Sequence, residues 1–387
     1  MNEVDARTLI YTIAALAVLS TLILLMMSRF FPEKIRGLNH WSLGTLSLSC
    51  TFALVRRRGE ISDWLSIVVA NGLVIIGLLL FISALLSFYQ RGLIKWRVYL
   101  IVGLPLTAII IWFTYGVESF QVRLMVMAAA QTVLFGIICA IPLRFGKFRS
   151  GEWVFSVAFG FAAIVSATRL VSTLVGVDIP QHLLDVDLLQ VVYLASFSLT
   201  LLLGTIGFIL LANENLREQL EYLATYDSLS QVLNRRAFFE RAQVMLAQGQ
   251  RACEPVAVLL IDIDDFKHIN DQFGHHVGDQ VIASLCQIAK GQLKEQDLLG
   301  RYGGEEFSVM LKMTSHASAL EVAQRIRQAI EAGSVGLAAS DSPCYTVSIG
   351  LAPAGSTDTV ESLMIRADQA LYRAKQAGRN RVEATLR

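Results

Sequence analysis

The stretch GRYGGEEFSVML, Gly300 to Leu311, decides how the C-terminal half of this chain folds. The apolar runs 298–302 and 306–312 predict two strands, and the two glycines between them predict a tight β-hairpin. Glycine adopts a positive φ at no steric cost and lets another molecule approach the backbone closely. The carboxylates that follow, Glu305 and Glu306, repel each other, so the turn favours a bound cation. Taken alone, the tetrapeptide favours a solvated acidic turn, and the rest of the chain has to decide for a cation site.

Composition divides the chain into an apolar half and a charged half. Of its 387 residues 54% are hydrophobic and 17% are charged, against about 25% charged in an ordinary soluble domain, so part of the chain is expected in a membrane. Residues 1–211 hold 15 Lys+Arg and 10 Asp+Glu, a net charge of +5, and residues 212–387 hold 18 and 22, a net charge of −4. The acidic half argues against a nucleic-acid binder, which needs a basic face. The five cysteines are scattered singly and show no metal-site spacing.

Seven apolar stretches predict membrane spans, each of which needs about 20 mostly apolar residues. The predicted spans are 8–28, 39–55, 64–88, 97–115, 121–143, 153–176 and 189–212. The second stretch is the weakest because it is short and rich in Ser and Thr. The sequence before the first stretch, MNEVDAR, lacks the positive region of a cleavable signal, so this span is expected to be retained.

The basic loops predict the orientation of these spans. The loops after the first, third and fifth spans are basic and the loop after the sixth is acidic. We therefore expect a multi-pass protein of the bacterial inner (cytoplasmic) membrane, with the N-terminus outside and residues 213–387 in the cytoplasm. Arg56, Arg57 and Arg58 contradict this pattern because their loop is placed outside. Arg169, inside the sixth span, is either a functional intramembrane charge or a side chain that snorkels to the outer end, and the sequence favours snorkelling.

A helical connector is predicted after the last span. Leu216, Leu220 and Leu223 recur at helical spacing with charged residues between them. This pattern suits pairing with the same helix of a second chain, although a polar continuation of the span gives the same pattern. The expected organisation is a membrane domain at 1–212 that acts as a sensor, a connector at 213–225 and a catalytic domain at 226–387.

The cytoplasmic half predicts an α+β fold, after an all-α transmembrane bundle in the first half. We expect strands at 256–263, 298–302, 306–312 and 345–352, and helices on one face of the sheet at 276–294, 316–333 and 360–377. Asp262 ends the first strand, so Asp262, Glu305 and Glu306 converge if that strand pairs with the hairpin. Convergent carboxylates favour a hard cation such as Mg²⁺, completed by substrate phosphates. The sequence has no Walker A motif and no His/Cys cluster, which excludes P-loop and zinc chemistry.

The motifs of this half together resemble the GGDEF family of diguanylate cyclases, in its GGEEF form. The similar blocks, in the family's order and spacing over about 225–383, are YDSLSQVLNRR, DIDDFKHINDQFGHHVGD, RYGGEEF, SIGLA and ALYRAKQAGRNRV. The resemblance implies a palm-like nucleotide-cyclase sheet with flanking helices. It also implies that a homodimer condenses two GTP into cyclic di-GMP and two pyrophosphates with Mg²⁺ or Mn²⁺, each chain holding one GTP.

The resemblance further implies roles for individual residues. Asp262, the backbone carbonyl of Ile263 and Glu305 match the metal ligands, and Glu306 matches the residue that helps to hold a metal or to activate the attacking hydroxyl. Asn270 and Asp279 match the residues that recognise guanine, because a carboxylate accepts hydrogen bonds from a donor pair that adenine lacks. The positions that match triphosphate contacts are Lys267, Lys375 and Arg379, and those that let the backbone approach the nucleotide are Gly303 and Gly304.

Two positions depart from the family pattern. The stretch KEQD, Lys294 to Asp297, stands where many members carry an Arg-x-x-Asp site for inhibition by the product. Lysine lacks the bidentate fork of arginine, so we expect this inhibitory site to be degenerate. Gln231 replaces a usual glycine, which is expected to change how that turn packs.

Two other functions remain open at this point. One is a catalytically silent GGDEF domain that binds GTP or cyclic di-GMP and signals by protein contact. The other is a transporter with a regulatory tail. The intact signature residues favour the enzyme, and the membrane half lacks repeated buried carboxylates of a pump. The stimulus that a membrane sensor would detect is not named by the sequence.

Overall fold

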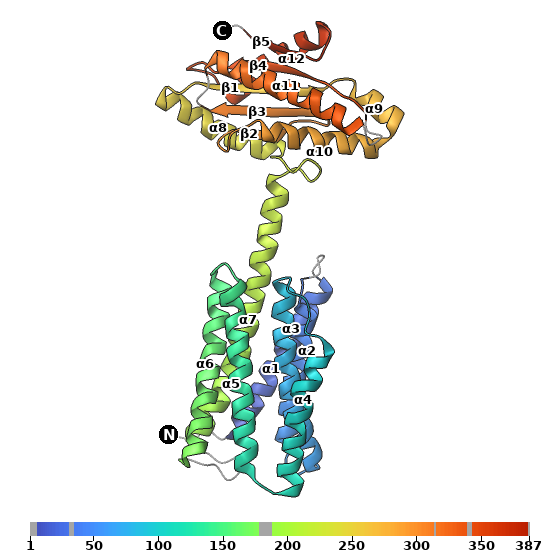
Figure 1. Cartoon of the computed structure of the whole chain (residues 1–387). Helices are drawn as coiled ribbons and strands as arrows, with labels where there is room; N and C mark the ends of the chain where they lie inside the picture. Colours follow the sequence, from blue (N-terminus) through green and yellow to red (C-terminus); the bar gives the residue numbers. More distant parts are fainter. Residues whose placement is uncertain (1–5, 31–34, 178–187, 313–314, 339–342, 386–387) are drawn as a thin grey trace. The chain divides into compact units, whose positions relative to one another are not determined.

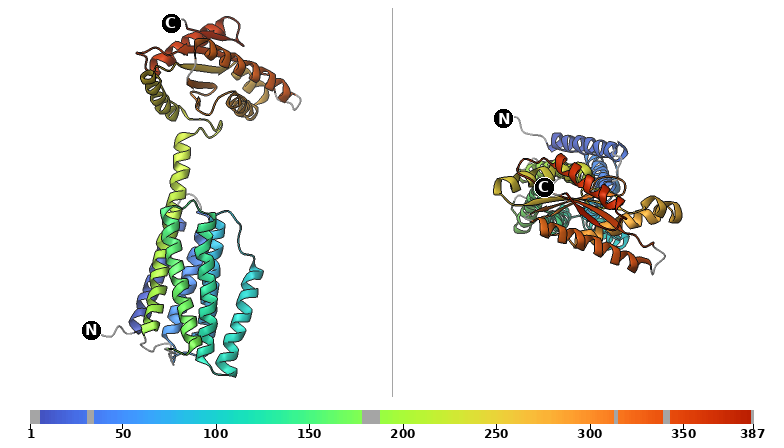
Figure 2. Two further views of the ribbon diagram at one scale, coloured as in Figure 1. Left: turned by 60° about the vertical axis from the view of Figure 1, so that its left-hand side comes forward. Right: turned by 90° about the horizontal axis from the view of Figure 1, so that it is seen from above.

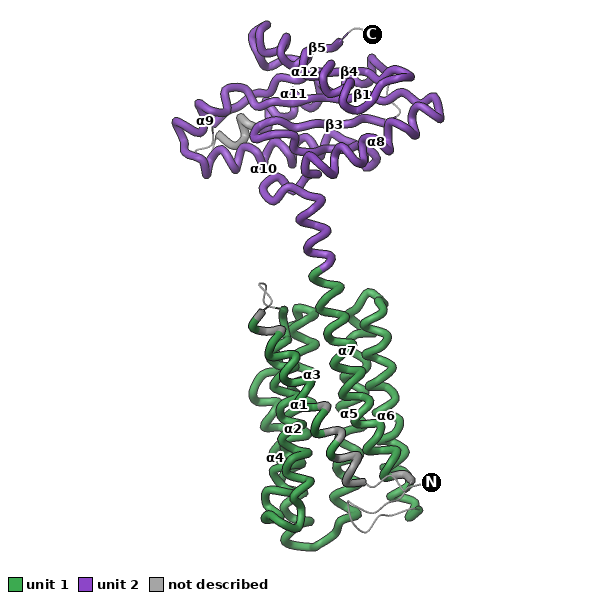
Figure 3. The backbone as a smooth tube through the Cα atoms, turned by 180° about the vertical axis from the view of Figure 1, so that it is seen from behind, with its two compact units in different colours: residues 1–216 green, residues 217–387 purple. Residues whose placement is uncertain are grey.

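The computed structural model divides the chain into two compact units, residues 1–216 and residues 217–387 (Figure 3). The residues it describes are 6–30, 35–177, 188–312, 315–338 and 343–385. One hydrophobic core lies in the first unit and two lie in the second.

Unit 1 is a helical bundle (Figure 1). Its described elements are α1 (Ala6–Phe30), α2 (Leu38–Arg56), the π-helix η1 (Trp64–Val69) that continues as α3 (Ala70–Phe88), α4 (Trp96–Ile111) that continues as the π-helix η2 (Trp112–Gly116), α5 (Phe120–Phe145), α6 (Ser150–Val175) and α7 (Leu188–Thr225). A helix therefore lies at each of the seven predicted spans. Within the described residues, five are long and apolar enough to cross a membrane: Trp64–Phe88, Trp96–Gly116, Phe120–Phe145, Ser150–Val175 and Gln190–Thr225.

Helix α2, whose stretch is the weakest of the predicted spans, directs its polar residues toward its neighbours. Thr45 accepts a hydrogen bond from Thr21 of α1, and the hydroxyl groups of Ser47 and Thr51 donate to backbone carbonyls at Leu73 and Ala70. These hydroxyl groups are buried and paired, so they do not carry the cost of an unsatisfied polar group. This explains how a helix of lower hydropathy packs inside the bundle.

The expectation that Arg169 snorkels is wrong. Its side chain is 2% exposed and points into the bundle. It donates a hydrogen bond to Gln190, and its guanidinium lies 4.1 Å from the centre of the Tyr193 ring. Polar and aromatic partners at the start of α7 therefore hold the charge inside the protein.

Unit 2 is built on a five-stranded sheet with the order β2-β3-β1-β4-β5. The strands are β1 (Val256–Ile263), β2 (Leu298–Arg301), β3 (Glu306–Lys312), β4 (Val347–Pro353) and β5 (Val382–Ala384). The helices are α8 (Arg235–Ala252), α9 (Phe266–Phe273), α10 (His275–Gly291), α11 (His316–Ala338) and α12 (Val360–Gln376). Strand β1 is antiparallel to both of its neighbours, β3 and β4, while β5 is parallel to β4. The α+β fold with flanking helices is therefore confirmed.

The expectation that helices cover one face of this sheet is wrong. Leu259 and Ile261 of β1 pack in the core that includes α10 and α11, whereas Val258 and Leu260 pack in the core that includes α8 and α12. Figures 1 and 2 show helices on both sides of the sheet. Strand β1 is buried at every position, and a strand that is apolar at both odd and even positions needs cover on both faces.

Helix α12 packs closely on β4. A Cβ atom on Gly350 would lie 2.0 Å from the carbonyl oxygen of Ala367. Glycine in the SIGLA stretch therefore lets the helix backbone touch the strand. This packing fixes the helix whose C-terminal residues contribute to the candidate site.

Candidate functional site

The hairpin predicted from the Gly-Gly stretch is confirmed, since β2 pairs with β3 in the antiparallel sense. The backbone N–H groups of Tyr302 and Gly303 donate to the carbonyl of Glu306 at 2.8 and 3.2 Å. The expected positive φ is wrong, because neither Gly303 nor Gly304 is among the residues with positive φ in the described chain. A Cβ on Gly303 would lie 2.7 Å from Oε2 of Glu306, so a side chain there would displace the Glu306 carboxylate.

The predicted convergence of carboxylates follows from strand pairing. Because β1 and β3 are adjacent, Asp262 is the register partner of Glu306, and the backbone N–H of Ile263 donates to the carbonyl of Glu305. Asp262 is buried and the two glutamates are half-buried. Burial raises the pKa of Asp262, although its bond to Lys375 opposes this. Burial, and then repulsion from Asp262, raise the pKa values of Glu305 and Glu306.

Two cations near the end of α12 face the end of β1 and the loop that follows it. Lys375 Nζ lies 2.8 Å from Asp262 Oδ2, and Arg379 Nη2 lies 3.4 Å from Asp265 Oδ1. The chain turns between them, because Gly378 has φ of 111° and Arg379 has φ of 61°. Both cations expected at the triphosphate therefore point toward the strand end that carries Asp262.

The oxygen atoms at this strand end suit a hard divalent cation. The described residues contain no cluster of three or more His, Cys, Asp or Glu side chains with metal-binding geometry. The set expected from the resemblance is smaller: the carboxylates of Asp262 and Glu305 with the carbonyl of Ile263, residues that the β1–β3 pairing brings together. Mg²⁺ and its relatives bind through few protein oxygens and complete their coordination with water and phosphate. The raised pKa values indicate negative charge that such a cation would relieve.

Asp264 is a positioning residue that the sequence analysis missed. It is 7% exposed and accepts hydrogen bonds from the hydroxyl groups of Thr346 and Ser348, at 2.7 and 2.6 Å, and from the backbone N–H of Asn380 at 3.0 Å. These bonds tie the end of β1 to β4 and to the segment after α12. The available signal was an acidic residue directly after a fully buried strand, where a paired charge is expected.

Arg301 was also missed, although it is the first residue of the RYGGEEF block. Its guanidinium donates to the carbonyls of Gly303 and Gly304, with a closest distance of 2.6 Å, and to Asp227 Oδ1 at 2.9 Å. Burial raises the pKa of Asp227, but hydrogen bonds from Ser230 and the charge of Arg301 outweigh it and leave the pKa below its ordinary value. Arg301 thus links the glycine turn to the segment that follows α7.

The predicted guanine-binding residues lie on α9 and α10. Asn270 packs against Gly278, where a Cβ would lie 2.0 Å from Asn270 Oδ1, so Asn270 lies next to the turn of helix that carries Asp279. Lys267 is exposed on the first turn of α9. A separate hollow of about 540 Å³ lies beside the carboxylates, and its wall includes Glu306 and Lys375.

The KEQD residues lie apart from the carboxylates, at the end of the β2–β3 hairpin opposite to the glycine turn. Lys294 is exposed. Asp297 accepts hydrogen bonds from the backbone N–H groups of Lys294 and Lys312, at 2.9 and 3.1 Å. Its carboxylate therefore closes the loop before β2.

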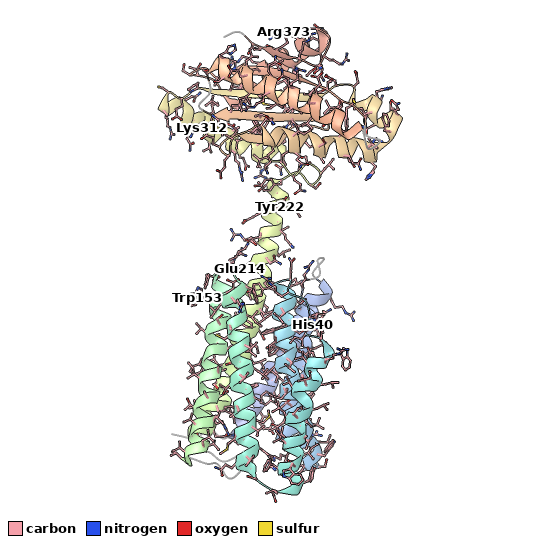
Figure 4. All side chains as sticks on the ribbon, viewed as in Figure 1. His40, Trp153, Glu214, Tyr222, Lys312 and Arg373 are labelled. Carbon is pink, nitrogen blue, oxygen red and sulfur yellow. The ribbon has the colours of Figure 1, made fainter. Side chains whose placement is uncertain are left out.

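Gln231, the other departure from the family pattern, has a left-handed backbone with φ of 56°. Glycine is the residue that adopts this conformation without strain. The Gln231 side chain donates to the carbonyl of Ser228 at 2.8 Å and accepts a hydrogen bond from Tyr222 at the end of α7 (Figure 4). The substitution therefore adds a side-chain link between α7 and this turn.

Comparison with known proteins identifies the family to which this half of the chain is similar. Residues 224–381 match the family described as diguanylate cyclase, GGDEF domain. Diguanylate cyclase DgcM of Escherichia coli (strain K12) is 40% identical over 171 residues, which are 44% of this chain and 41% of that protein. Response regulator PleD of Caulobacter vibrioides is 41% identical over 170 residues, 43% of this chain and 37% of that protein. The chain thus spans about two fifths of the length of these curated relatives.

Among solved structures, one that is similar to part of this chain is a GGDEF domain. The GGDEF domain of DgcB from Caulobacter crescentus, in complex with c-di-GMP, is 32% identical and has a TM-score of 0.40. That match covers 42% of this chain and 93% of the solved chain.

Proposed function

The chain belongs, through residues 224–381, to the GGDEF family of diguanylate cyclases, and from this premise we propose that it is an active enzyme. It condenses two GTP molecules into cyclic di-GMP with release of two pyrophosphates. The observation that carries the proposal is the pairing of Asp262 with Glu306 beside Glu305, at a glycine turn that Arg301 holds in place.

The carboxylates have distinct proposed roles. Asp262, Glu305 and the carbonyl of Ile263 hold a divalent cation, Mg²⁺ or Mn²⁺. When bound, this cation neutralises charge on the phosphoryl oxygens and lowers the pKa of the attacking hydroxyl. Glu306 accepts the proton of the 3′-hydroxyl. Its raised pKa favours this role, because a general base works best when its pKa approaches the operating pH.

The remaining site residues bind and orient GTP. Lys375 and Arg379, with Lys267, bind the triphosphate through charge-assisted hydrogen bonds. Asn270 and Asp279 recognise the guanine edge, and a site built to pair with guanine leaves buried polar groups unpaired when adenine is bound. GTP is therefore preferred to ATP.

A homodimer is needed because one domain holds one GTP and the product contains two nucleotides. The 3′-hydroxyl of each GTP attacks the α-phosphorus of the other, the P–O bond to pyrophosphate breaks, and pyrophosphate leaves. The exposed apolar face of α7, with Leu220 and Leu223 each 57% exposed, supports pairing of this helix with its copy. We further propose that unit 1 crosses the bacterial inner membrane as a multi-pass sensor, with its N-terminus outside and unit 2 in the cytoplasm.

Product formation tests this function directly. A fragment of residues 213–387 fused to a dimerising helix is incubated with GTP and Mg²⁺, and cyclic di-GMP is followed by chromatography. Product from the wild-type fragment and none from Glu305→Gln is the expected result. GTP binding without any product would instead favour a silent domain that signals by protein contact.

A further inference from the structure

Unit 1 contains a partly open cavity of about 120 Å³ among α2, η1, α3, α5, α6 and α7. The lining residues come from the end of α2 and the loop after it, the start of η1 and α3, the start of α5, the last turns of α6 and the first turns of α7. In a bundle of alternating helices these segments lie at one end, the end where α7 begins (Figure 1). Three arginines and no carboxylate are among the described residues that line the cavity.

Two of these arginines stand near each other: Arg58 in the loop after α2 and Arg123 in the first turn of α5. Arg123 is 7% exposed and donates to the backbone carbonyl of Phe113 at 2.7 Å. The guanidinium groups of Arg58 and Arg123 each lie 6.0 Å from the centre of the Phe120 ring. Asp63 is close enough to act on the charges of both Arg58 and Arg123, and Glu118 acts on the charge of Arg123. In the described part of the chain, however, neither carboxylate forms a salt bridge with Arg58 or Arg123.

The third arginine, Arg169, belongs to a hydrogen-bonded group farther along the lining. Its guanidinium lies over the Tyr193 ring, and the Tyr193 hydroxyl donates to Gln131. Asn71, which donates to the carbonyl of Ile67, adds a further polar side chain to the wall. The cavity is thus supplied with positively charged and neutral polar groups that are held in place by neighbouring atoms.

Apolar side chains complete the wall, with Phe52, Met127 and Phe197 among them. The volume is close to the roughly 150 Å³ that holds a benzene molecule in an apolar cavity. A ligand that fits this space carries an apolar body no larger than a benzene ring. Burying several like charges together is costly unless an opposite charge joins them, and a carboxylate matches the fork of arginine in a bidentate pair.

We propose that this cavity binds a small organic anion, a carboxylate with a short apolar body. Its carboxylate pairs with Arg58 and Arg123, and its apolar body contacts the aromatic wall. Tyr193 and Phe197 belong to α7, so the ligand touches the helix that continues to Thr225 and into unit 2. The role of this site as the sensor of a cyclase rests on the proposed function, whereas ligand binding does not.

This proposal also explains the exception in the loop charges. The orientation expected from the basic loops places Arg56, Arg57 and Arg58 outside, against the usual bias. Arg58 lines the cavity and Arg56 lies 4.3 Å from the centre of the Tyr11 ring. A ligand-binding role gives a reason to keep positive charge at this end of the bundle.

Direct binding to the full-length chain tests the site. The chain is reconstituted in phosphatidylcholine nanodiscs and dialysed to equilibrium against radiolabelled benzoate. We expect saturable binding of one benzoate per chain that butyrate displaces and the neutral isostere benzamide does not. Arg58→Gln is expected to weaken binding at least about tenfold, since charged hydrogen bonds are among the strongest. It is preferred to Arg123→Gln because Arg123 also bonds to the backbone at Phe113.

Arg57→Gln is the matched control, because Arg57 is exposed in the same loop and does not line the cavity. It should bind benzoate as the wild type does. No saturable binding, equal displacement by benzamide, or equal weakening by Arg57→Gln and Arg58→Gln would overturn the proposal. The carboxylate could come from a free small molecule or from a lipid headgroup, and nanodiscs that contain phosphatidylserine distinguish the two. Loss of benzoate binding in these nanodiscs would assign the site to the lipid headgroup. Because GTP is absent from the assay, its result is independent of whether the chain makes cyclic di-GMP.

Discussion

Arg301 and Asp227 provide the most direct test of how the glycine turn is held. The substitution Arg301→Gln removes the ion pair to Asp227 and the bonds to the carbonyls of Gly303 and Gly304. The two side chains are 17% and 24% exposed, so the pair is neither a surface pair nor fully buried. Surface pairs contribute about 0–1 kcal/mol, and removing one partner of a buried pair costs about 3–5 kcal/mol. We therefore expect a loss of about 2–3 kcal/mol.

Chemical denaturation of the fragment 213–387 measures this loss. In thermal unfolding of the same fragment, a loss of this size lowers Tm by roughly 4–12 °C for a domain of this length. Asp227→Asn and the double variant complete a cycle, in which we expect a coupling free energy of about 1–2 kcal/mol. Arg236→Gln is the control, because the Arg236–Glu240 pair is 85% and 61% exposed and its loss should leave the fragment as stable as wild type.

The pH dependence gives a second signature of the same pair. The pKa of Asp227 is depressed in the folded state, so its stabilisation is present above the unfolded value, near 3.9, and is lost as the pH falls through the folded value. The difference in unfolding free energy between wild type and Asp227→Asn should therefore shrink as the pH falls from about 5 toward 3. Additive effects of the two substitutions, or an Arg301→Gln fragment within about 0.5 kcal/mol of wild type, would refute the argument.

Three further substitutions test the site and the departures from the family pattern. Glu305→Gln should abolish turnover and also raise the unfolding temperature in differential scanning fluorimetry. Because the pKa of Glu305 is raised, its ionised form destabilises the fold above that pKa, and the substitution removes this charge. A lower unfolding temperature would contradict this. Wild type should retain its activity as cyclic di-GMP accumulates, whereas Lys294→Arg should become inhibited, because arginine restores the bidentate fork; equal inhibition curves for both proteins would refute the idea. Gln231→Gly should stabilise the fragment by about 0.5–1 kcal/mol, because φ is 56° at this position, and a loss in denaturation experiments would show that the bond to Tyr222 outweighs the strain.

The parts of the site that the sequence predicted are those fixed by strand register. Two apolar runs and a glycine pair predict the hairpin. If the strand that ends at Asp262 is then taken as its neighbour, Asp262 lies beside Glu306. The same local rules predicted helices at all seven apolar stretches. The prediction that helices cover only one face of the sheet was wrong. The sequence of β1, VAVLLIDI, is apolar at odd and even positions alike, which indicates burial on both faces.

The parts that escaped prediction depend on contacts between residues far apart in the chain. Arg301 meets Asp227 across 74 positions, and Asp264 meets the backbone of Asn380 across 116. A periodic pattern predicts which face of an element is buried, but it does not predict which charged groups meet when elements pack. The first contact depends on how β2 packs against the segment after α7, and the second on how the end of β1 packs against the segment after α12.

The arginines of unit 1 show how such a contact changes the interpretation of a sequence rule. Taken singly, Arg58 is an exception to the positive-inside pattern of the loops, Arg123 has no role predicted from the sequence, and Arg169 is expected to reach the membrane surface. Because α2, α5 and α6 bring them to one cavity, the three charges have a common explanation that none has alone. If an anion occupies that cavity, neutralising Arg58 will weaken anion binding while the neighbouring Arg57 tolerates the same change. That contrast, rather than the number of positive charges in the loop, decides whether the exception reflects topology or recognition.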